Sequence, residues 1–566
     1  MEKTYQPVFG PEDYINVHTY TAMGMCYEDF ERPVIGICNT WNELVPGQYN
    51  LRQVADFVKK GILRAGGNPV EFGAIACCDG VTTGNDGDYY VLPSREIIAD
   101  SVEVMAKAHK LDGIVLVGSC DKIVPGLLMG AARLNIPAIF VPGGPSLSGP
   151  PFGKKLKGDC TCITEAMGME QAGIISHEEL QKLARLTDPT CGSCQFMGTA
   201  NTMCCFAEAL GMCLPGAALI PAVYAERFRC AFQSGEQIMR LVNLGIRPRD
   251  IMTMPAIQNT IKVLMAVGGS TNSVIHMCAI AYELGYDPAV IMEEFDRISD
   301  EIPHIASVNP ASYLYDCEDF YKAGGIPEVM KKLRVDLDLS VMTVTGRTME
   351  ENIDGYINLY PGNSDLIRSL DNPHTTLGGI AILRGNLAPE TGVSKPAAIH
   401  ESVRRFTGRA VCFNSQEDCV KALEQRRIQK GDVVVIRYEG PKGGPGMREM
   451  YAPLKMLNGQ GLALDTALVT DGRVSGTNNG CYVVHVSPEA AVGGPIALVE
   501  NGDTITIDVL EKKLELHVSD EELARRRAEW HYQPKEVSGY LARYAALAAS
   551  GSQGCVLDWK GISKHE

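Results

Sequence analysis

The chain of 566 residues lacks a basic excess, a membrane-length hydrophobic run and a secretory signal. Lysine and arginine number 52 against 68 aspartate and glutamate residues, so the formal net charge is −16. This balance argues against nucleic acid or an anionic membrane as a main partner. No apolar stretch reaches the roughly 18 residues that a membrane span needs, and no basic segment followed by an apolar run opens the sequence. These absences predict a cytoplasmic protein that acts on a small molecule.

Cysteine, by contrast, is abundant. The chain has 19 cysteines, and in a long chain without a signal we expect reduced thiols that serve metals or catalysis more often than disulfides. Most of them, such as Cys230, Cys278 and Cys412, are predicted to be inert apolar residues of the core. Only cysteines at special places in the fold are therefore candidates for chemistry.

Strand and helix patterns alternate in the first part of the chain. The sequence predicts strands over residues 33–38, 74–78, 112–118 and 136–141, and helices over 54–65 and 93–109. Such alternation is typical of a parallel sheet covered by helices on both faces. From residue 201 to 339 the patterns are mainly helical, most clearly over 201–210 and 251–284. The first part of the chain is therefore predicted to be an α/β domain.

The pattern changes after a polar segment at residues 361–376, which we interpret as a linker. Beyond it the sequence predicts short strands over 432–437, 496–499, 504–509 and 514–518, and a closing helix over about 539–549. The resulting prediction is an N-terminal parallel-sheet α/β domain of residues 1–365 and a smaller, β-rich, barrel-like domain of residues 376–566.

Polar segments follow three of the predicted strands. They are Cys38-Asn39-Thr40-Trp41, Cys78-Asp79-Gly80 and Ser119-Cys120-Asp121-Lys122. Because the carboxyl ends of parallel strands meet at one rim of a sheet, we expect these side chains to share a site. A thiolate suits iron or zinc, whereas a carboxylate suits magnesium or manganese. The rim is thus predicted to hold two different kinds of metal.

The segment Cys191-Gly192-Ser193-Cys194 has several interpretations. It could be a redox dithiol, although a thioredoxin-like context is missing. It could be half of a zinc site, although no partner pair has the spacing of a zinc finger. It could supply iron–sulfur ligands together with Cys120, or be two packed thiols without chemistry. The pair alone does not decide between them.

Three glycine-containing loops also leave two interpretations each. Gly268-Gly269-Ser270-Thr271-Asn272 could present backbone N–H groups to an anion or only break a helix. The loop at residues 440–449 could approach a ligand closely or be a mobile surface loop. In the loop at residues 470–476, Ser475 could be a nucleophile or base, or only a turn residue.

Together these segments resemble one family, the dihydroxy-acid dehydratases and sugar-acid dehydratases. The resemblance runs from about residue 33 to 557, and its motifs are Cys120-Asp121-Lys122-Ile123-Val124-Pro125-Gly126, Thr190-Cys191-Gly192-Ser193-Cys194, Thr199-Ala200-Asn201-Thr202-Met203, Gly268-Gly269-Ser270-Thr271-Asn272, the run from Glu439 to Glu449, and Thr470-Asp471-Gly472-Arg473-Val474-Ser475-Gly476 followed by His485-Val486-Ser487-Pro488-Glu489. It implies a hydro-lyase that converts a 2,3-dihydroxy acid to a 2-keto acid, and it implies a homodimer.

The resemblance also implies cofactors and their ligands. Cys120 and Cys194 match ligands of an iron–sulfur cluster. Asp79, Asp121 and Glu449 match ligands of Mg²⁺, for which Mn²⁺ is the substitute.

Other positions match catalytic and substrate-binding roles. Lys122 matches a lysine that family members carbamylate, which turns a cation into an oxygen ligand, and Ser475 matches the base that takes the α-proton. The residues that we expect to bind substrate are Ser270, Thr271, Asn272 and Arg473.

The chain departs from many family members at the cluster. Where those members have a third cysteine ligand, this chain has Gly47, and it carries Cys191, which they usually lack. We therefore expect a [4Fe–4S] cluster on Cys120, Cys191 and Cys194 in preference to a [2Fe–2S] cluster. Cys77 or Cys78 is the alternative third ligand.

The resemblance leaves the substrate open. Residues 540–544 and the His485 segment are closer to enzymes of branched-chain amino-acid biosynthesis, which act on 2,3-dihydroxyisovalerate and 2,3-dihydroxy-3-methylvalerate. Thr477-Asn478-Asn479-Gly480 departs from that pattern, so dehydration of a sugar acid (aldonate) is the alternative. A second alternative is an inactive iron–sulfur redox or sensor protein, against which the retained Asp79, Lys122 and Ser475 argue.

Overall fold

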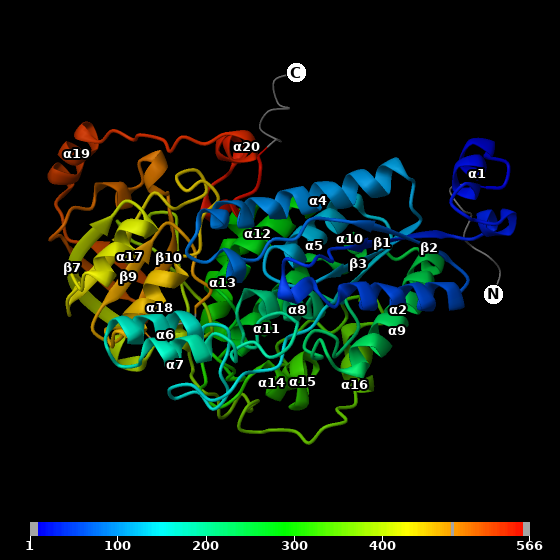
Figure 1. Cartoon of the computed structure of the whole chain (residues 1–566), viewed down its shortest axis with the longest axis horizontal. Coiled ribbons are helices and arrows are strands. Elements are labelled where there is room, and N and C mark those ends of the chain that lie inside the picture. Colours follow the sequence, from blue (N-terminus) through cyan, green and yellow to red (C-terminus); the bar gives the residue numbers. More distant parts are fainter. Residues whose placement is uncertain (1–9, 477–479, 559–566) are drawn as a thin grey trace.

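A computed structural model describes residues 10–476 and 480–558 (Figure 1). It contains two separate β-sheets, one of four strands and one of eight. Figure 1 shows the first sheet with its helices in one half of the molecule, the second sheet in the other half, and helices such as α8 and α11 between them. This is the predicted combination of an α/β part and a β-rich part. The domain limits at residues 365 and 376 stay a prediction, and residues 361–376 contain no helix or strand.

The first sheet is parallel throughout. Its strand order is β2-β1-β3-β4, and each neighbouring pair is parallel. The strands are β1 Val34–Asn39, β2 Asn68–Gly73, β3 Gly113–Gly118 and β4 Ala138–Pro142. The two central strands, β1 and β3, are buried at every position, as their apolar sequences require.

One strand prediction was wrong. The segment 74–78 forms no strand, and β2 lies just before it at Asn68–Gly73. β2 is an edge strand whose exposed positions include Glu71, so its sequence lacks the continuous apolar run of a central strand. The apolar residues 74–78 instead run from the strand toward helix α3 Asp79–Thr82.

Helices cover both faces of the first sheet, as predicted. In Figure 1, α2 Leu51–Arg64 and α9 Ala225–Leu244 lie on one side, and α4 Val91–Ala108 and α5 Ile123–Leu134 lie on the other. α2 and α9 pack unusually close, because a Cβ on Gly61 would lie 2.1 Å from the carbonyl oxygen of Phe232. Only glycine therefore fits at this crossing.

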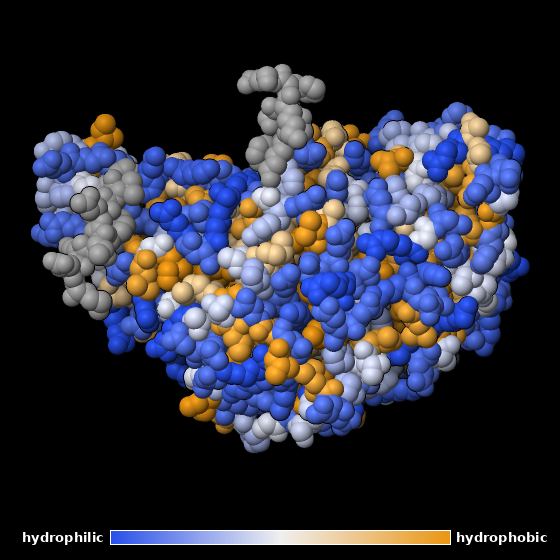
Figure 2. All heavy atoms as spheres, turned by 180° about the vertical axis from the view of Figure 1, so that it is seen from behind, coloured by the Kyte–Doolittle hydropathy of each residue, from blue (hydrophilic) through white to orange (hydrophobic). Residues whose placement is uncertain are grey.

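The central helical layer also matches the prediction. It includes α8 Thr199–Ala209, α11 Met254–Val267, α12 Asn272–Leu284 and α13 Pro288–Glu301. The remaining α-helices up to the linker are α1 Tyr14–Thr21, α6 Cys162–Gln171, α7 His177–Leu183, α10 Pro248–Ile251, α14 Cys317–Lys322, α15 Gly325–Lys332 and α16 Met349–Gly355. No helix of the described residues is both long enough and apolar enough to span a membrane. On the face shown in Figure 2, hydrophilic residues predominate and hydrophobic ones form small scattered groups.

The second sheet is mixed and nearly closes on itself. Its strand order is β12-β11-β7-β8-β9-β10-β6-β5. The strands are β5 Ala381–Leu383, β6 Thr391–Ser394, β7 Arg405–Phe413, β8 Asp432–Ile436, β9 Ala467–Thr470, β10 Cys481–Ser487, β11 Thr504–Asp508 and β12 Lys513–Leu516. A bridge between Arg384 and Lys513 joins the ends of the two edge strands. This near-closure confirms the barrel-like prediction.

Residues 496–499 were wrongly predicted to be a strand. Pro495–Leu498 is a 3₁₀ helix, which follows from a Gly-Gly-Pro sequence in which Pro495 lacks the N–H that a strand ladder needs. Three helices complete this part of the chain: α17 Gln416–Glu424, α18 Tyr451–Gly459 and α19 Asp520–Glu529. The predicted closing helix is α20 Gly539–Leu547.

Candidate active site

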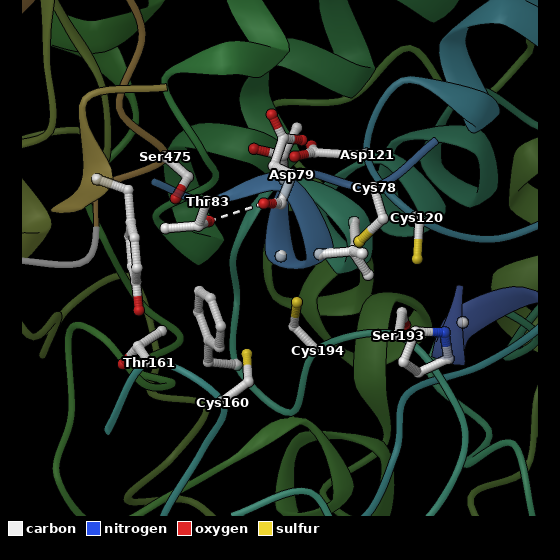
Figure 3. Close-up of a pocket in the computed structure, with 18 of the residues that line it drawn as sticks. Cys78, Asp79, Thr83, Cys120, Asp121, Cys160, Thr161, Ser193, Cys194 and Ser475 are labelled. Carbon is white, nitrogen blue, oxygen red and sulfur yellow. Dashed lines mark hydrogen bonds between the residues drawn. The ribbon is translucent and has the colours of Figure 1, made fainter. Parts of the chain in front are cut away.

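A cavity of about 260 Å³ lies where residues that follow β1 and β3 meet loops of the second-sheet part of the chain (Figure 3). The carboxyl ends of parallel strands lie together at one edge of the sheet, and α/β proteins bind ligands at this edge. Residues that line it include Gly47, Cys78, Asp79, Cys120, Asp121, Cys160, Cys194, Glu449 and Ser475. The structure thus brings together residues that lie more than four hundred positions apart in the sequence.

Four thiols lie in this cavity, those of Cys78, Cys120, Cys160 and Cys194 (Figure 3). Cys120 directly follows β3 and has a φ of 67°, a left-handed conformation that costs a non-glycine residue about 1–2 kcal/mol. The neighbouring Cys120 thiol lowers the pKa of Cys78, whereas the Cys78 thiol and burial raise the pKa of Cys120. The Cys194 thiol and burial likewise raise the pKa of Cys160. Such sulfur groups are ligands for soft metal ions.

Gly47 lies directly against these thiols. A Cβ at this position would be 2.2 Å from the Sγ atom of Cys120, so the backbone approaches the sulfur as only glycine allows. The position at which many family members carry a cysteine ligand therefore does face the thiol side of the cavity.

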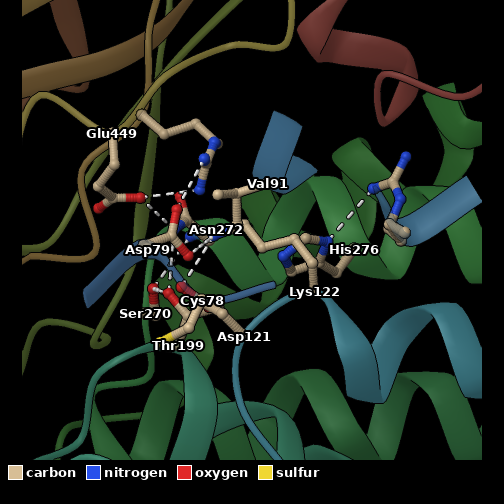
Figure 4. Close-up of polar contacts among 12 residues, drawn as sticks. Cys78, Asp79, Val91, Asp121, Lys122, Thr199, Ser270, Asn272, His276 and Glu449 are labelled. Atoms are coloured by element: carbon tan, nitrogen blue, oxygen red, sulfur yellow. Dashed lines mark hydrogen bonds and ion pairs between the residues drawn. The ribbon is translucent and has the colours of Figure 1, made fainter. Parts of the chain in front are cut away.

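The carboxylates of the site are bridged by two cations (Figure 4). The Lys122 ammonium lies 2.5 Å from Asp79 Oδ2 and 2.8 Å from Asp121 Oδ2. The Arg473 guanidinium lies 3.0 Å from Asp79 Oδ1 and 2.9 Å from Glu449 Oε2. Both cations are fully buried, so these ion pairs are shielded from water.

The acidic side chains of the site outnumber its two buried cations. Burial favours the neutral form of Asp79, but Lys122 and Arg473 outweigh burial and hold its pKa well below the ordinary value. Burial, which exceeds the attraction of Lys122, raises the pKa of Asp121 well above its ordinary value. Burial and repulsion from Asp79 raise the pKa of Asp88 to about 7. The site therefore holds more acid than its own cations neutralise.

Several carboxylate oxygens of the site have no hydrogen-bond partner. They are Oδ1 of Asp88, Oδ1 of Asp121 and Oε1 of Glu449, all buried. Buried polar atoms are normally satisfied, and an unsatisfied one points to a missing ion or water. Within residues 10–476 and 480–558, no three His, Cys, Asp or Glu side chains form a finished ion site. The surplus of acids and of free oxygens nevertheless fits a hard divalent cation such as Mg²⁺.

Asp88 was missed by the sequence interpretation. It lies in the 3₁₀ helix Asp86–Tyr90, is 1% exposed, and accepts a hydrogen bond of 3.0 Å from the backbone N–H of Glu449. The only signal in the sequence was its place nine residues after Asp79, in the run Asn85-Asp86-Gly87-Asp88. Acidic turns of this kind are too common to single out.

The two loops of the second-sheet part hold each other in place. A backbone bridge pairs Glu449 with Arg473, and the N–H of Arg473 donates to the carbonyl of Arg448 at 2.8 Å. In the loop at residues 440–449, every residue except Lys442 is buried. This loop is therefore not a mobile surface loop. Its position supports the other interpretation, that it approaches a ligand closely.

Ser270, Thr271 and Asn272 are fully buried and lie behind the acids, outside the cavity lining. The Asn272 amide donates to Glu449 Oε2 at 2.9 Å, and the Ser270 hydroxyl lies 2.8 Å from that of Thr199 (Figure 4). Thr271 donates to the carbonyl of Val474, next to Ser475. Their contacts fix site residues, and direct binding of substrate by them stays a prediction.

The other predicted residues divide between the cavity and its surroundings. Ser475 lines the cavity and is 9% exposed. Cys191 and Cys77 are not among the described lining residues, and Cys38 is buried inside β1. The departure at Asn478 and Asn479 lies outside the described residues.

An α/β sheet whose strand ends carry a cavity of thiols, acids and a serine hydroxyl has the composition of an enzyme active site. Comparison with known proteins assigns the class. The family model "Dihydroxy-acid/6-phosphogluconate dehydratase N-terminal" matches residues 32–352, and its C-terminal counterpart matches residues 365–555. The chain belongs to this dehydratase family, which confirms the resemblance, and it is a hydro-lyase.

Relatives match over nearly their whole length. A dihydroxy-acid dehydratase of Caldanaerobacter subterraneus subsp. tengcongensis is 49% identical over 545 residues, which cover 96% of this chain and 96% of the relative. One from Acetivibrio thermocellus is 48% identical over 544 residues, with 96% and 97% covered. One from Pyrococcus furiosus is 49% identical over 541 residues, with 95% and 96% covered.

Proposed function

We propose that this chain is an iron–sulfur and Mg²⁺-dependent dihydroxy-acid dehydratase of branched-chain amino-acid biosynthesis. Its substrates would be 2,3-dihydroxyisovalerate and 2,3-dihydroxy-3-methylvalerate, and its products the corresponding 2-keto acids. The names of the relatives support the dihydroxy-acid class. The observation that carries the proposal is the juxtaposition of thiols with unsatisfied carboxylate oxygens in one cavity.

The residues present fit both cofactors. Cys120 and Cys194 would hold the cluster with a third thiolate, for which the sequence favours Cys191 and a [4Fe–4S] cluster over a [2Fe–2S] one. Asp79, Asp121 and Glu449 would hold Mg²⁺ (or Mn²⁺), because two of them have buried oxygens without partners. Carbamylation of Lys122 would replace its ammonium group with oxygen ligands at the same place between Asp79 and Asp121.

The chemistry divides between cofactors and side chains. When bound, the cluster and Mg²⁺ would supply Lewis acids for the departing 3-hydroxyl and a positive field for the carboxylate and 2-hydroxyl. Ser475 Oγ, as an alkoxide stabilised by the positive field, would take the proton from C2 and become a hydroxyl, while the C3–O bond breaks and the 3-hydroxyl leaves as hydroxide. The enol that results tautomerises to the keto acid. Arg473, which pairs with Asp79 and Glu449, keeps both acids oriented, and with Lys122 it lowers the pKa of Asp79.

Apolar side chains in the cavity favour a branched alkyl substrate. Val81, Ile163, Phe196 and Tyr451 line it beside the polar groups. They match the methyl and ethyl groups of the branched-chain substrates, but Thr161, Thr164 and Asp188 also line the cavity and offer partners to the additional hydroxyls of an aldonate. A sugar acid is therefore the alternative that an assay must exclude.

The test is reconstitution with iron, sulfide and Mg²⁺ without oxygen, followed by a 2-keto acid assay on 2,3-dihydroxyisovalerate and a panel of aldonic acids. Preference for dihydroxyisovalerate supports the proposal. Turnover of aldonic acids alone would assign the enzyme to sugar-acid breakdown. A full cluster without any dehydration would favour the sensor alternative. Sedimentation of the same sample tests the homodimer.

A further inference from the structure

The thiols of the cavity differ from the set that the sequence favoured. Cys78 and Cys160 line the cavity together with Cys120 and Cys194, whereas Cys191 does not. Figure 3 shows the four sulfur atoms directed into the same space, with Cys160 on the side of Thr161 and Cys120 on the opposite side. The site therefore offers one thiol more than a cluster with an open iron needs.

Three of these thiols form one group. Cys78, Cys120 and Cys194 all line the cavity, and Figure 3 shows their sulfur atoms around the same space. They come from three separate segments: the residue before α3, the turn after β3 and the loop before α8. Residue 47 is a glycine, and any side chain at this position would collide with the sulfur of Cys120. A cavity of this kind, walled by three thiols and a glycine, has room for an inorganic group.

Cys160 lies on the Cys194 side of this group (Figure 3). Its backbone N–H donates to Gln195 Oε1 at 3.2 Å. Gln195 is fully buried and adjacent to Cys194 in the chain. The next residue, Thr161, donates its N–H to Asp159 Oδ1 at 2.7 Å, which fixes the turn before α6. The hydrogen bonds of this turn therefore hold Cys160 beside Cys194.

We propose that Cys78, Cys120 and Cys194 are the protein ligands of the cluster and that Cys160 covers its remaining iron when no substrate is bound. The assignment rests on the proposed function, and it replaces Cys191 with Cys78. A thiolate on that iron would shield it from oxygen and from chelators, because an uncovered iron is the one that solutes reach first. The S–H bond of Cys160 breaks as its bond to iron forms, with the proton released to water, and the substrate hydroxyl displaces the sulfur, which takes a proton back; no redox change accompanies this exchange.

The experiment compares variants of the anaerobically reconstituted full chain by iron content and Mössbauer spectroscopy. Cys191→Ala is expected to load iron like the wild type, whereas Cys78→Ala loses most of it. Cys160→Ala is expected to keep a four-iron cluster but to release iron to a chelator at least severalfold faster. Cys162→Ala is the matched control, since Cys162 is a buried thiol two residues away that packs with Phe152 and Ala166 outside the cavity lining.

The spectra give a readout independent of activity. Without substrate, the wild type is expected to show uniform, all-sulfur iron sites, and Cys160→Ala one distinct iron. Loss of the cluster in Cys191→Ala with retention in Cys78→Ala would overturn the assignment. So would a distinct iron in the substrate-free wild type. If the wild type takes up no cluster, the proposed cofactor itself fails.

A second measurement needs no variant and so does not depend on folding. Alkylation of the loaded and the cluster-free wild type, read by mass spectrometry, is expected to show protection of Cys78 and Cys160 by the cluster. Cys191 is expected to react equally in both samples. Protection of Cys191 instead of Cys78 would contradict the proposal.

Discussion

Replacement of Arg473 by methionine tests how the acids of the site are held in the metal-free protein. Arg473 is fully buried and pairs with Asp79 and Glu449, whereas Lys122 pairs with Asp79 and Asp121. The variant keeps an unbranched side chain but removes the guanidinium, so that no other cation of the described residues lies within ion-pair distance of Glu449. Among the described residues, Asp79 then keeps only Lys122 as a cationic partner.

The expected loss of stability is large because the pairs are buried. Removing one partner of a buried ion pair costs about 3–5 kcal/mol, since the remaining charge is left without compensation. The sign of the pH dependence follows from Asp79, whose pKa Lys122 and Arg473 hold below the ordinary value. That stabilisation is present above the ordinary pKa of about 3.9 and is lost as the pH falls through the folded value. The penalty of Arg473→Met is therefore expected to be full at about pH 7 and smaller at about pH 2, well below the ordinary pKa.

The assay is urea unfolding of the metal-free protein at both pH values. The control is Arg405→Met, because Arg405 pairs with Asp508 at 3.2 Å but its side chain is 74% exposed. Such an exposed pair contributes about 1 kcal/mol or less. If the loss at Arg473 is no larger than at Arg405, or does not shrink at the lower pH, the reasoning is refuted. Added Mg²⁺ is expected to restore part of the lost stability, since it supplies the missing positive charge.

Three further outcomes are expected. Ser475→Ala is expected to lower kcat by about 10²–10⁴-fold with unchanged cluster content, and near-normal kcat would exclude Ser475 as the base. Gly47→Ala is expected to lower cluster content, because the added Cβ would lie 2.2 Å from Cys120 Sγ; normal iron content would contradict this, and Gly10→Ala, where the space is open, is the control. Lys395→Met is expected to stabilise the protein by up to about 5 kcal/mol below pH 7, because burial lowers the pKa of Lys395 from 10.5 to about 7. The gain shrinks toward pH 10 as the lysine becomes neutral in the unfolded chain as well, and a gain that is independent of pH would show that charge burial is not its cause.

Much of the fold could be predicted because its signals are local. Strands β1 and β3 are continuous apolar runs, and helices α4 and α12 show apolar residues at helical spacing. The errors occurred where local pattern and tertiary role differ. Edge strand β2 is half exposed and looks weak, while the apolar residues 74–78 look like a strand but lead into the cavity. In the second sheet, short strands such as β6 acquire their structure from pairing with distant partners, which no local window contains.

By itself, the sequence determined the chemistry that is present and the family. The motifs around Cys120, Cys194, Glu449 and Ser475 are short runs of consecutive residues, so they can be recognised in the sequence. All four side chains line one cavity. Only the tertiary structure decided which other groups join them. It brought in Cys78, Cys160 and Asp88, set Cys191 apart, and placed Asn272 behind Glu449 as a support. The reason is that the identity of a ligand is a property of one residue. Whether a thiol or a carboxylate reaches the cavity depends instead on how the strand ends of one sheet pack against the loops of the other, hundreds of residues away.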